Sequence, residues 1–176
     1  MDNYNIVGLV TEAAKNVTAG YYKVETANGE QKYRERVFCY ELYHQMRERQ
    51  KNYFYGLIIN GELDKTGNIN YKREKPDFVI HVQGTDDRNE AIIEVKNTLQ
   101  EEDVYKDIGK IDRFIRNHKY KMGIFLTYNQ PLSEVEKVIK EIRVLRCIEN
   151  KENIYIIAAD NSKNIEVKQL SEIVNV

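Results

Sequence analysis

The feature that most constrains the fold of this chain is a pair of strand-like segments joined by a tight turn. The segments "KPDFVIHVQ" (75–83) and "EAIIEVKN" (90–97) are rich in apolar residues, and "GTDDRN" between them is rich in turn-forming residues. A stretch with helical periodicity follows, and then "KMGIFLTY" (121–128), whose nearly unbroken apolar sequence is typical of a strand buried on both faces. An antiparallel hairpin followed by a strand–helix–strand crossover predicts an α/β domain, with a mixed central sheet flanked by helices.

The remaining segments extend this pattern toward both ends of the chain. Hydrophobic periodicity predicts helices at 3–16 and 32–50, and strands at 53–63, 153–160 and 164–170, the last at an edge of the sheet. Capping boxes at Thr98 and Ser133 predict the starts of two more helices. A length of 176 residues matches one domain, so we expect residues 1–176 to form a single domain.

Charge and composition exclude some classes of protein. The chain contains no run of about 20 apolar residues and begins without a basic segment followed by an apolar one, so we expect a cytoplasmic protein with no membrane partner. We expect Cys39 and Cys147 to be buried free thiols, with a disulfide between them as the alternative. A net charge of -1 gives no overall signature of nucleic-acid binding, so any such function must depend on local groups of charge.

The tripeptide Glu-Val-Lys ends the second strand of the hairpin. Side chains alternate between the faces of a strand, so Glu94 and Lys96 point to the same face. With the turn centred between Asp86 and Asp87, Asp77 lies opposite Lys96 and on that face as well. Carboxylates on neighbouring strands repel each other unless a cation lies between them, because paired positions are only ~4.5 to 8 Å apart. The alternative is a cross-strand salt bridge on a solvated face.

The same tripeptide recurs as Glu166, Val167 and Lys168. This copy has no Pro-Asp on a partner strand and no following helix that could close a pocket over it. We expect it to be an exposed, charged edge strand, so it serves as an internal control for the first copy.

Pro76-Asp77 and, seventeen residues after the aspartate, Glu94-Val95-Lys96 resemble the signature of the PD-(D/E)XK nuclease superfamily. The resemblance covers roughly residues 32–130 and implies a restriction-endonuclease-like fold, in which a helix precedes a three-stranded meander and a crossover helix leads to a fourth strand. The helix at 3–16 and the segment 131–176 would be additions to that core.

The resemblance also implies an activity. It implies a magnesium-dependent nuclease that hydrolyses phosphodiester bonds, with DNA as the expected substrate and Mn²⁺ as a substitute for Mg²⁺. Asp77, Glu94 and the backbone carbonyl of Val95 would bind the metal, and Lys96 would hold the attacking water and offset negative charge. Two alternatives remain open: a non-catalytic member of the same fold that binds nucleic acid or a protein partner, for example in a defence or repair complex, and a structural domain whose sheet face pairs with another chain. A homodimer is compatible with each.

Many members of that superfamily add an acidic residue from the first helix of the core. Glu41 lies among apolar and aromatic residues of the segment 32–50, where an unpaired carboxylate is costly, so we expect it to complete the catalytic and metal-binding set. An ion pair with an arginine is the alternative. Glu62 is a second candidate for that place, and His44, one turn after Glu41, could reach the site.

Basic residues near the motif are candidates for phosphate contacts. Lys106, Lys110 and Arg113 follow at spacings of four and three, which places them on one face of the helix after the motif. Together with "YKREK" (71–75) they could contact the backbone of a nucleic acid held over the metal. An ordinary solvated surface is the alternative for both groups.

Overall fold

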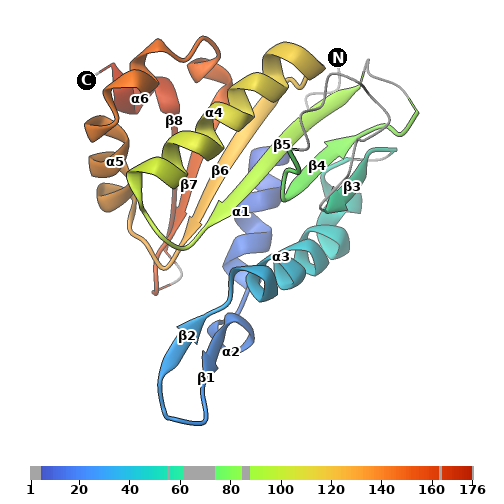
Figure 1. Cartoon of the computed structure of the whole chain (residues 1–176). Coiled ribbons are helices and arrows are strands. Elements are labelled where there is room, and N and C mark those ends of the chain that lie inside the picture. The colour runs from blue at the N-terminus through green and yellow to red at the C-terminus, as the bar shows by residue number, and fades with distance from the viewer. Residues whose placement is uncertain (1–4, 55, 62–73, 85–87, 163, 176) are drawn as a thin grey trace.

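A mixed six-stranded sheet forms the centre of the computed structural model, with helices on both of its faces (Figure 1). The structure describes all residues except 1–4, 55, 62–73, 85–87, 163 and 176. In spatial order the strands are β3 (Ile58–Gly61), β4 (Phe78–His81), β5 (Asn89–Lys96), β6 (Met122–Tyr128), β7 (Ile154–Ala159) and β8 (Ile165–Gln169). The strands β3, β4 and β5 form an antiparallel meander, β5, β6 and β7 are parallel, and β8 is antiparallel to β7. The predicted mixed α/β sheet is confirmed.

The longer helices divide between the two faces of the sheet. The helices α1 (Ile6–Asn16) and α3 (Glu35–Arg49) cover one face, and α4 (Glu101–His118), α5 (Leu132–Glu141) and α6 (Leu170–Val174) cover the other (Figure 1). Short helical turns complete the chain: α2 (Ala19–Tyr22), η1 (Gln50–Asn52), η2 (Arg143–Cys147) and η3 (Lys151–Asn153). The sheet is therefore the middle of three layers.

Two separate hydrophobic cores hold these layers together, one on each face of the sheet. Along β5 the side chains alternate between them, with Ile93 and Val95 in the core under α1 and α3 and Ile92 in the core under α4 and α5. All three are fully buried, and burial of one such side chain stabilises the fold by roughly 1.5–3 kcal/mol. Since both faces of β5 are covered, any charged group on this strand must be paired or reach the end of the sheet.

The hairpin of β4 and β5 has a register two residues away from the predicted one. Val79 lies opposite Ile92 and not opposite Glu94, and the pairing shifts by one residue between Ile80 and His81. A displacement by two keeps every side chain on its predicted face, because side chains alternate with a period of two. Asp77 therefore stays on the face of Glu94 and Lys96 despite the error in register.

The N-terminal part of the chain contains a hairpin that the sequence pattern did not reveal. The strands β1 (Lys23–Glu25) and β2 (Gln31–Tyr33) pair with each other, separate from the main sheet, and project from the body of the molecule (Figure 1). The predicted helix 32–50 consequently begins only at Glu35. The strand predicted at 53–63 is shorter as well: β3 covers only Ile58–Gly61, and residues 55, 62 and 63 of that segment lie outside the described residues.

Local signals were less accurate than the pattern of elements. The N-caps of α4 and α5 are Gln100 and Pro131, and neither makes a side-chain capping bond, so the two predicted capping boxes are wrong. Cys39 and Cys147 are free thiols, but Cys147 is exposed, so its predicted burial is also wrong. Within the described residues, no helix has both the length and the apolar character needed to cross a membrane.

Candidate active site

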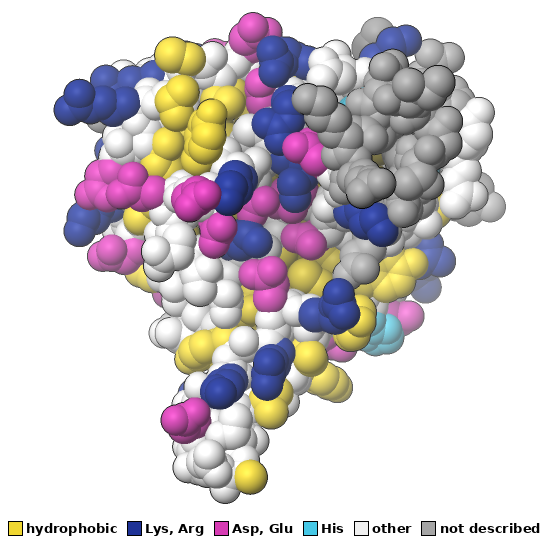
Figure 2. Space-filling model, in the orientation of Figure 1, with side chains coloured by type: hydrophobic (Ala, Val, Ile, Leu, Met, Phe, Trp, Pro, Cys, Tyr) yellow, Lys and Arg dark blue, Asp and Glu magenta, His cyan; other side chains and the backbone are white. Residues whose placement is uncertain are grey.

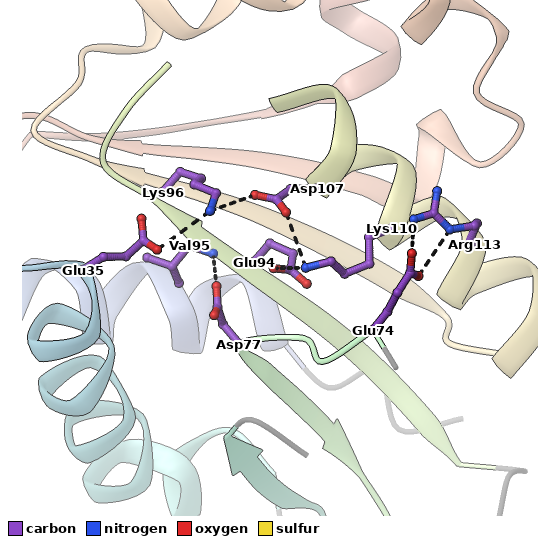
Figure 3. A network of polar contacts seen from close by, with 9 residues as sticks. All are labelled: Glu35, Glu74, Asp77, Glu94, Val95, Lys96, Asp107, Lys110 and Arg113. Carbon is purple, nitrogen blue, oxygen red and sulfur yellow. Dashed lines mark hydrogen bonds and ion pairs between the residues drawn. The ribbon is translucent and has the colours of Figure 1, made fainter. Parts of the chain in front are cut away.

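Six charged side chains from three parts of the fold meet where β5 ends. Asp77 directly precedes β4, Glu94 and Lys96 belong to β5, and Figure 3 shows them beside Glu35, Asp107 and Lys110. Glu35 begins α3, whereas Asp107 and Lys110 lie on α4. The charged cluster defined by these six residues thus joins the sheet to helices on both of its faces.

Asp77 is held in place by the backbone of the neighbouring strand. The Val95 N–H donates a hydrogen bond to Asp77 Oδ2 over 2.8 Å, which fixes the carboxylate across the end of the hairpin (Figure 3). Burial raises the pKa of Asp77 above its ordinary value, although this hydrogen bond and the lysines nearby oppose the shift. Its second oxygen, Oδ1, has no protein donor among the described contacts.

Glu94 is the most buried member of the charged cluster. Its side chain is 3% exposed, and Oε2 accepts from the Lys110 ammonium at 2.9 Å. Within the described part of the chain, Oε1 is buried and has no hydrogen-bond partner. Burial and the charge of Asp77 raise the pKa of Glu94 well above its ordinary value, against the opposing effect of Lys110. An unpaired buried carboxylate oxygen costs free energy, so this atom favours a proton or a cation beside it.

Lys96 forms ion pairs with helices on both faces of the sheet. Its Nζ lies 3.3 Å from Asp107 Oδ2 and 3.8 Å from Glu35 Oε1 (Figure 3). Burial alone would lower the pKa of Lys96, but the carboxylates of Asp107 and Glu35 more than offset burial and raise it. Lys96 therefore keeps its positive charge beside Asp77 and Glu94 at neutral pH.

Two further members of the charged cluster come from α4, where sequence reasoning missed Asp107 and did not place Lys110 in the cluster. Lys110 Nζ bridges Glu94 and Asp107, lying 3.4 Å from Asp107 Oδ1, and its side chain is mostly buried. Lys110 thus lies inside the charged cluster and not on a free cationic face, and its contact with phosphate stays a prediction. The spacing of three residues between Asp107 and Lys110 was the available signal, because it places both on one side of a helix.

The other two cations of the predicted phosphate-binding face are also paired. Lys106 binds Glu102 on the exposed side of α4, and Arg113 binds Glu74 through two nitrogens, with distances of 2.6 and 3.3 Å. Acidic and basic side chains lie interleaved across the middle of the face that Figure 2 shows. The predicted cationic face on α4 is consequently neutralised by its own neighbours. Residues 71–73 of the segment 71–75 lie outside the described residues.

Glu35, and not Glu41, is the acidic residue that α3 brings to the charged cluster. The two are six positions apart, which turns them by about 240° around the helix axis. Glu41 Oε1 accepts a hydrogen bond of 2.5 Å from Gln45, away from Asp77 and Glu94. Burial, followed by the charge of Asp77, raises the pKa of Glu35 despite the opposing effect of Lys96. The apolar neighbours of Glu41 in the sequence misled, because Glu41 lies on another side of α3 and is bound by Gln45.

Of the remaining candidates, those that the structure describes do not join the cluster. His44 is exposed on α3, and Glu62 lies outside the described residues. The second Glu-Val-Lys copy is on β8, where Glu166 is exposed and Lys168 binds Glu136 of α5. The prediction of a charged edge strand is confirmed there, since β8 ends the sheet.

The charge balance of the cluster bears on whether it could hold a metal ion. Four carboxylates face two ammonium groups, so the fully ionised cluster carries two negative charges in excess. As the side chains stand, no three acidic, histidine or cysteine residues in the described part of the chain form a ready metal site. The oxygens left over, Asp77 Oδ1 and Glu94 Oε1, are nevertheless the hard ligands that Mg²⁺ prefers. The chemistry of these donors suits a divalent cation, but the ammonium of Lys110 already lies beside Glu94 and would have to yield for one to bind.

No family model matches this chain, and neither a curated protein nor a solved structure shows a significant match to it. Functional assignment therefore rests on the geometry of the charged cluster and on the order of the elements that carry it.

Proposed function

We propose that this protein is a magnesium-dependent nuclease that hydrolyses phosphodiester bonds, with DNA as its expected substrate. The observation that carries the proposal is the buried Glu94 Oε1, which has no hydrogen-bond partner in the described part of the chain and lies in a cluster that carries two excess negative charges when fully ionised. One divalent cation would neutralise both charges and give that oxygen a partner. The buried position of Glu94 makes this neutralisation worth more than on a solvated surface.

The arrangement of elements supports the same assignment. The helix α3 precedes the antiparallel meander of β3, β4 and β5, and α4 then crosses over to the parallel strand β6. This is the order expected for a restriction-endonuclease-like core, with α1 and the segment after β6 as additions. Asp77 and Glu94 lie on the two strands that such a core uses for its metal ligands.

In the proposed reaction, Asp77, Glu94 and Lys96 would each have a distinct task. Asp77, oriented by the Val95 N–H, and Glu94 would bind the metal together with the Val95 carbonyl, and Mn²⁺ would serve in place of Mg²⁺. When bound, the ion would polarise the scissile phosphate and lower the pKa of the attacking water. Lys96, kept charged by Asp107 and Glu35, would orient that water and stabilise negative charge as it develops on the phosphate.

One contact favours a second candidate, a protein of the same fold that binds nucleic acid or a partner without cutting it. The Lys110 ammonium already hydrogen-bonds to Glu94 and lies beside Asp107, so an internal cation partly fills the place of the metal. If Lys110 does not move, the cluster is a structural ion-pair network.

Cleavage of a circular plasmid and of labelled oligonucleotides, with Mg²⁺, with Mn²⁺ or with chelator, tests the proposal. We expect cleavage only with metal, and a loss of at least about 100-fold in Glu94→Gln and Lys96→Met, because each removes charge complementarity at the reacting phosphate. The matched controls are Glu166→Gln and Lys168→Met, which change the same tripeptide on β8 and should retain activity. Equal activity in the two pairs of variants, or none in the wild type, would refute the nuclease assignment. Retained nucleic-acid binding without calorimetric uptake of Mg²⁺ would favour the second candidate.

A further inference from the structure

An open pocket of about 680 Å³ adjoins the charged cluster on the side of α3. Asp77 and Glu35 belong to both, so the pocket and the cluster share a wall. The rest of the pocket is formed by one face of α3 and by the facing ends of β3 and β4. Its volume lies within the range of about 300–1,000 Å³ that is typical of sites for small organic groups.

Aromatic rings line this pocket at two depths. Inside, the rings of Tyr43 and Phe78 stack with an interplanar angle of 8°, and the Tyr43 hydroxyl donates to the Ile59 carbonyl over 3.3 Å, which fixes the wall. At the rim, the Tyr40 side chain is 64% exposed. A planar group entering the pocket would meet a rigid aromatic wall and could be covered by Tyr40.

The same pocket also contains polar groups that could bind the edge of a base and a phosphate. The Asn60 side chain is held by a hydrogen bond of 2.8 Å between its Oδ1 and His81 Nε2, so its amide is oriented within the wall. Arg36 contributes a guanidinium group to the wall formed by α3. An oriented amide suits the polar edge of a base, and a guanidinium suits a phosphate or a stacked ring.

We infer that this pocket binds an unpaired nucleotide next to the phosphate held at the charged cluster, so that the substrate is a single strand or a frayed end. The inference rests on the proposed function, because it takes the cluster as the place of the scissile phosphate. A base within a duplex is stacked on both sides and paired along its edge, so it could not enter between Tyr40 and the inner wall without leaving the helix. Any base can stack on an aromatic side chain, so the pocket would distinguish single-stranded from double-stranded nucleic acid but would not distinguish base sequences.

The test is fluorescence anisotropy with labelled 12-nucleotide single strands of DNA and of RNA and with the matching blunt DNA duplex, all in chelator. We expect at least one of the single strands to bind about tenfold or more tightly than the duplex. Comparison of the affinities of the DNA and RNA strands shows which nucleic acid the pocket prefers. Tyr40→Ala should weaken single-strand binding by about tenfold, and Tyr40→Phe should retain it, because the ring and not the hydroxyl stacks on the base. The matched control is Tyr105→Ala, which removes an exposed tyrosine of α4 that is 44% accessible.

The inference is overturned if the duplex binds as well as both single strands, if no probe binds, or if Tyr40→Ala behaves like Tyr105→Ala. Because no divalent cation is present, these results do not depend on cleavage. Tyr40-dependent binding by a protein that never cuts would refute the proposed hydrolysis and leave the nucleotide pocket intact. Both tyrosines are exposed, so neither variant should impair folding, and circular dichroism checks this.

Discussion

Lys110 lies at the point where Asp77, Glu94 and Asp107 would otherwise concentrate uncompensated negative charge. Its ammonium is tethered to α4, so it can approach Glu94 but cannot supply the two charges of a metal ion. Burial alone lowers the pKa of Lys110, but the carboxylates of Glu94, Asp107 and Asp77 together outweigh burial and raise it. Lys110 therefore remains a permanent counter-ion near neutral pH, and a bound metal has to compete with it.

Replacement of Lys110 by methionine should separate its structural role from this competition. In chelator we expect Lys110→Met to lose about 3–5 kcal/mol of unfolding free energy, because it leaves Glu94 buried without its partner. With Mg²⁺ we expect at least about tenfold tighter binding, since a competing positive charge has been removed. Urea denaturation and titration calorimetry measure the two effects.

The matched control for that experiment is Lys106→Met, one turn earlier on α4. Lys106 pairs with Glu102 on the exposed side of the helix, so its loss should change neither stability nor Mg²⁺ affinity measurably. Unchanged or weaker Mg²⁺ binding in Lys110→Met would show that this lysine and the metal do not compete.

Sequence reasoning identified the central residues of the site but not their surroundings. Asp77, Glu94 and Lys96 could be predicted because strand alternation depends only on local periodicity. Glu35, Asp107 and Lys110 could not be placed in the same way, since their positions depend on how α3 and α4 dock against the sheet. Glu41 was chosen because its apolar neighbours in the sequence suggested a buried carboxylate, whereas Glu35, flanked by Arg34 and Arg36, gave no such signal.

At the scale of elements, α4 approaches the sheet closely over β6. A Cβ at Gly123 would overlap Ile111 Cγ2 and lie 3.3 Å from Ile111 Cβ, so only glycine allows this distance between helix and strand. The same helix presents Asp107 and Lys110 to the charged cluster. The depth at which α4 packs therefore sets the position of two of the three ion-pair partners that Glu94 and Lys96 have among the described residues.

Gly123→Ala should be strongly destabilising because the added methyl group forces α4 away from β6. We expect a loss of about 1–3 kcal/mol, the usual cost of overpacking a core. Gly20→Ala is the control, because a Cβ at Gly20 would meet no atom within 4 Å. Urea denaturation of the two variants provides the comparison, and equal midpoints would contradict the close packing of α4 on β6.

The order of the elements could be predicted from the sequence further than their ends could. Buried strands such as β6 and the hairpin of β4 and β5 carry strong apolar patterns, so they were found to within a few residues. The hairpin of β1 and β2 was missed because each strand has only three residues and all are exposed, which leaves no hydrophobic period to detect. The predicted capping boxes failed because a capping motif is satisfied by many sequences that begin their helices elsewhere.

At the scale of the whole molecule, the charged cluster links stability to pH and to metal. The pKa values of Asp77, Glu94 and Glu35 are raised in the folded protein, so these groups stabilise it most below their ordinary values near 4 and progressively less as the pH rises through the raised values. The lysines of the cluster do not counter this change, because their raised pKa values preserve their charge throughout that range.

We therefore expect the melting temperature in chelator to fall as the pH increases from about 5 to 8, and Mg²⁺ to restore more stability at pH 8 than at pH 5. Differential scanning fluorimetry measures this, and a change of about 1 kcal/mol corresponds to roughly 2–4 °C for a chain of this length. Glu94→Gln should flatten the dependence on pH and abolish the effect of Mg²⁺, because the neutral amide cannot ionise. A dependence that is identical in the wild type and Glu94→Gln would assign the titration to other groups.

The ion pairs of Lys96 have a mechanical consequence for the molecule. A single flexible side chain at the end of β5 binds Glu35 from one outer layer and Asp107 from the other. The two outer layers are thus held to one ammonium group at the end of the sheet, so both ion pairs depend on the position of one side chain. An anion that attracts the Lys96 ammonium would therefore lengthen its ion pairs with Glu35 and Asp107 at the same time.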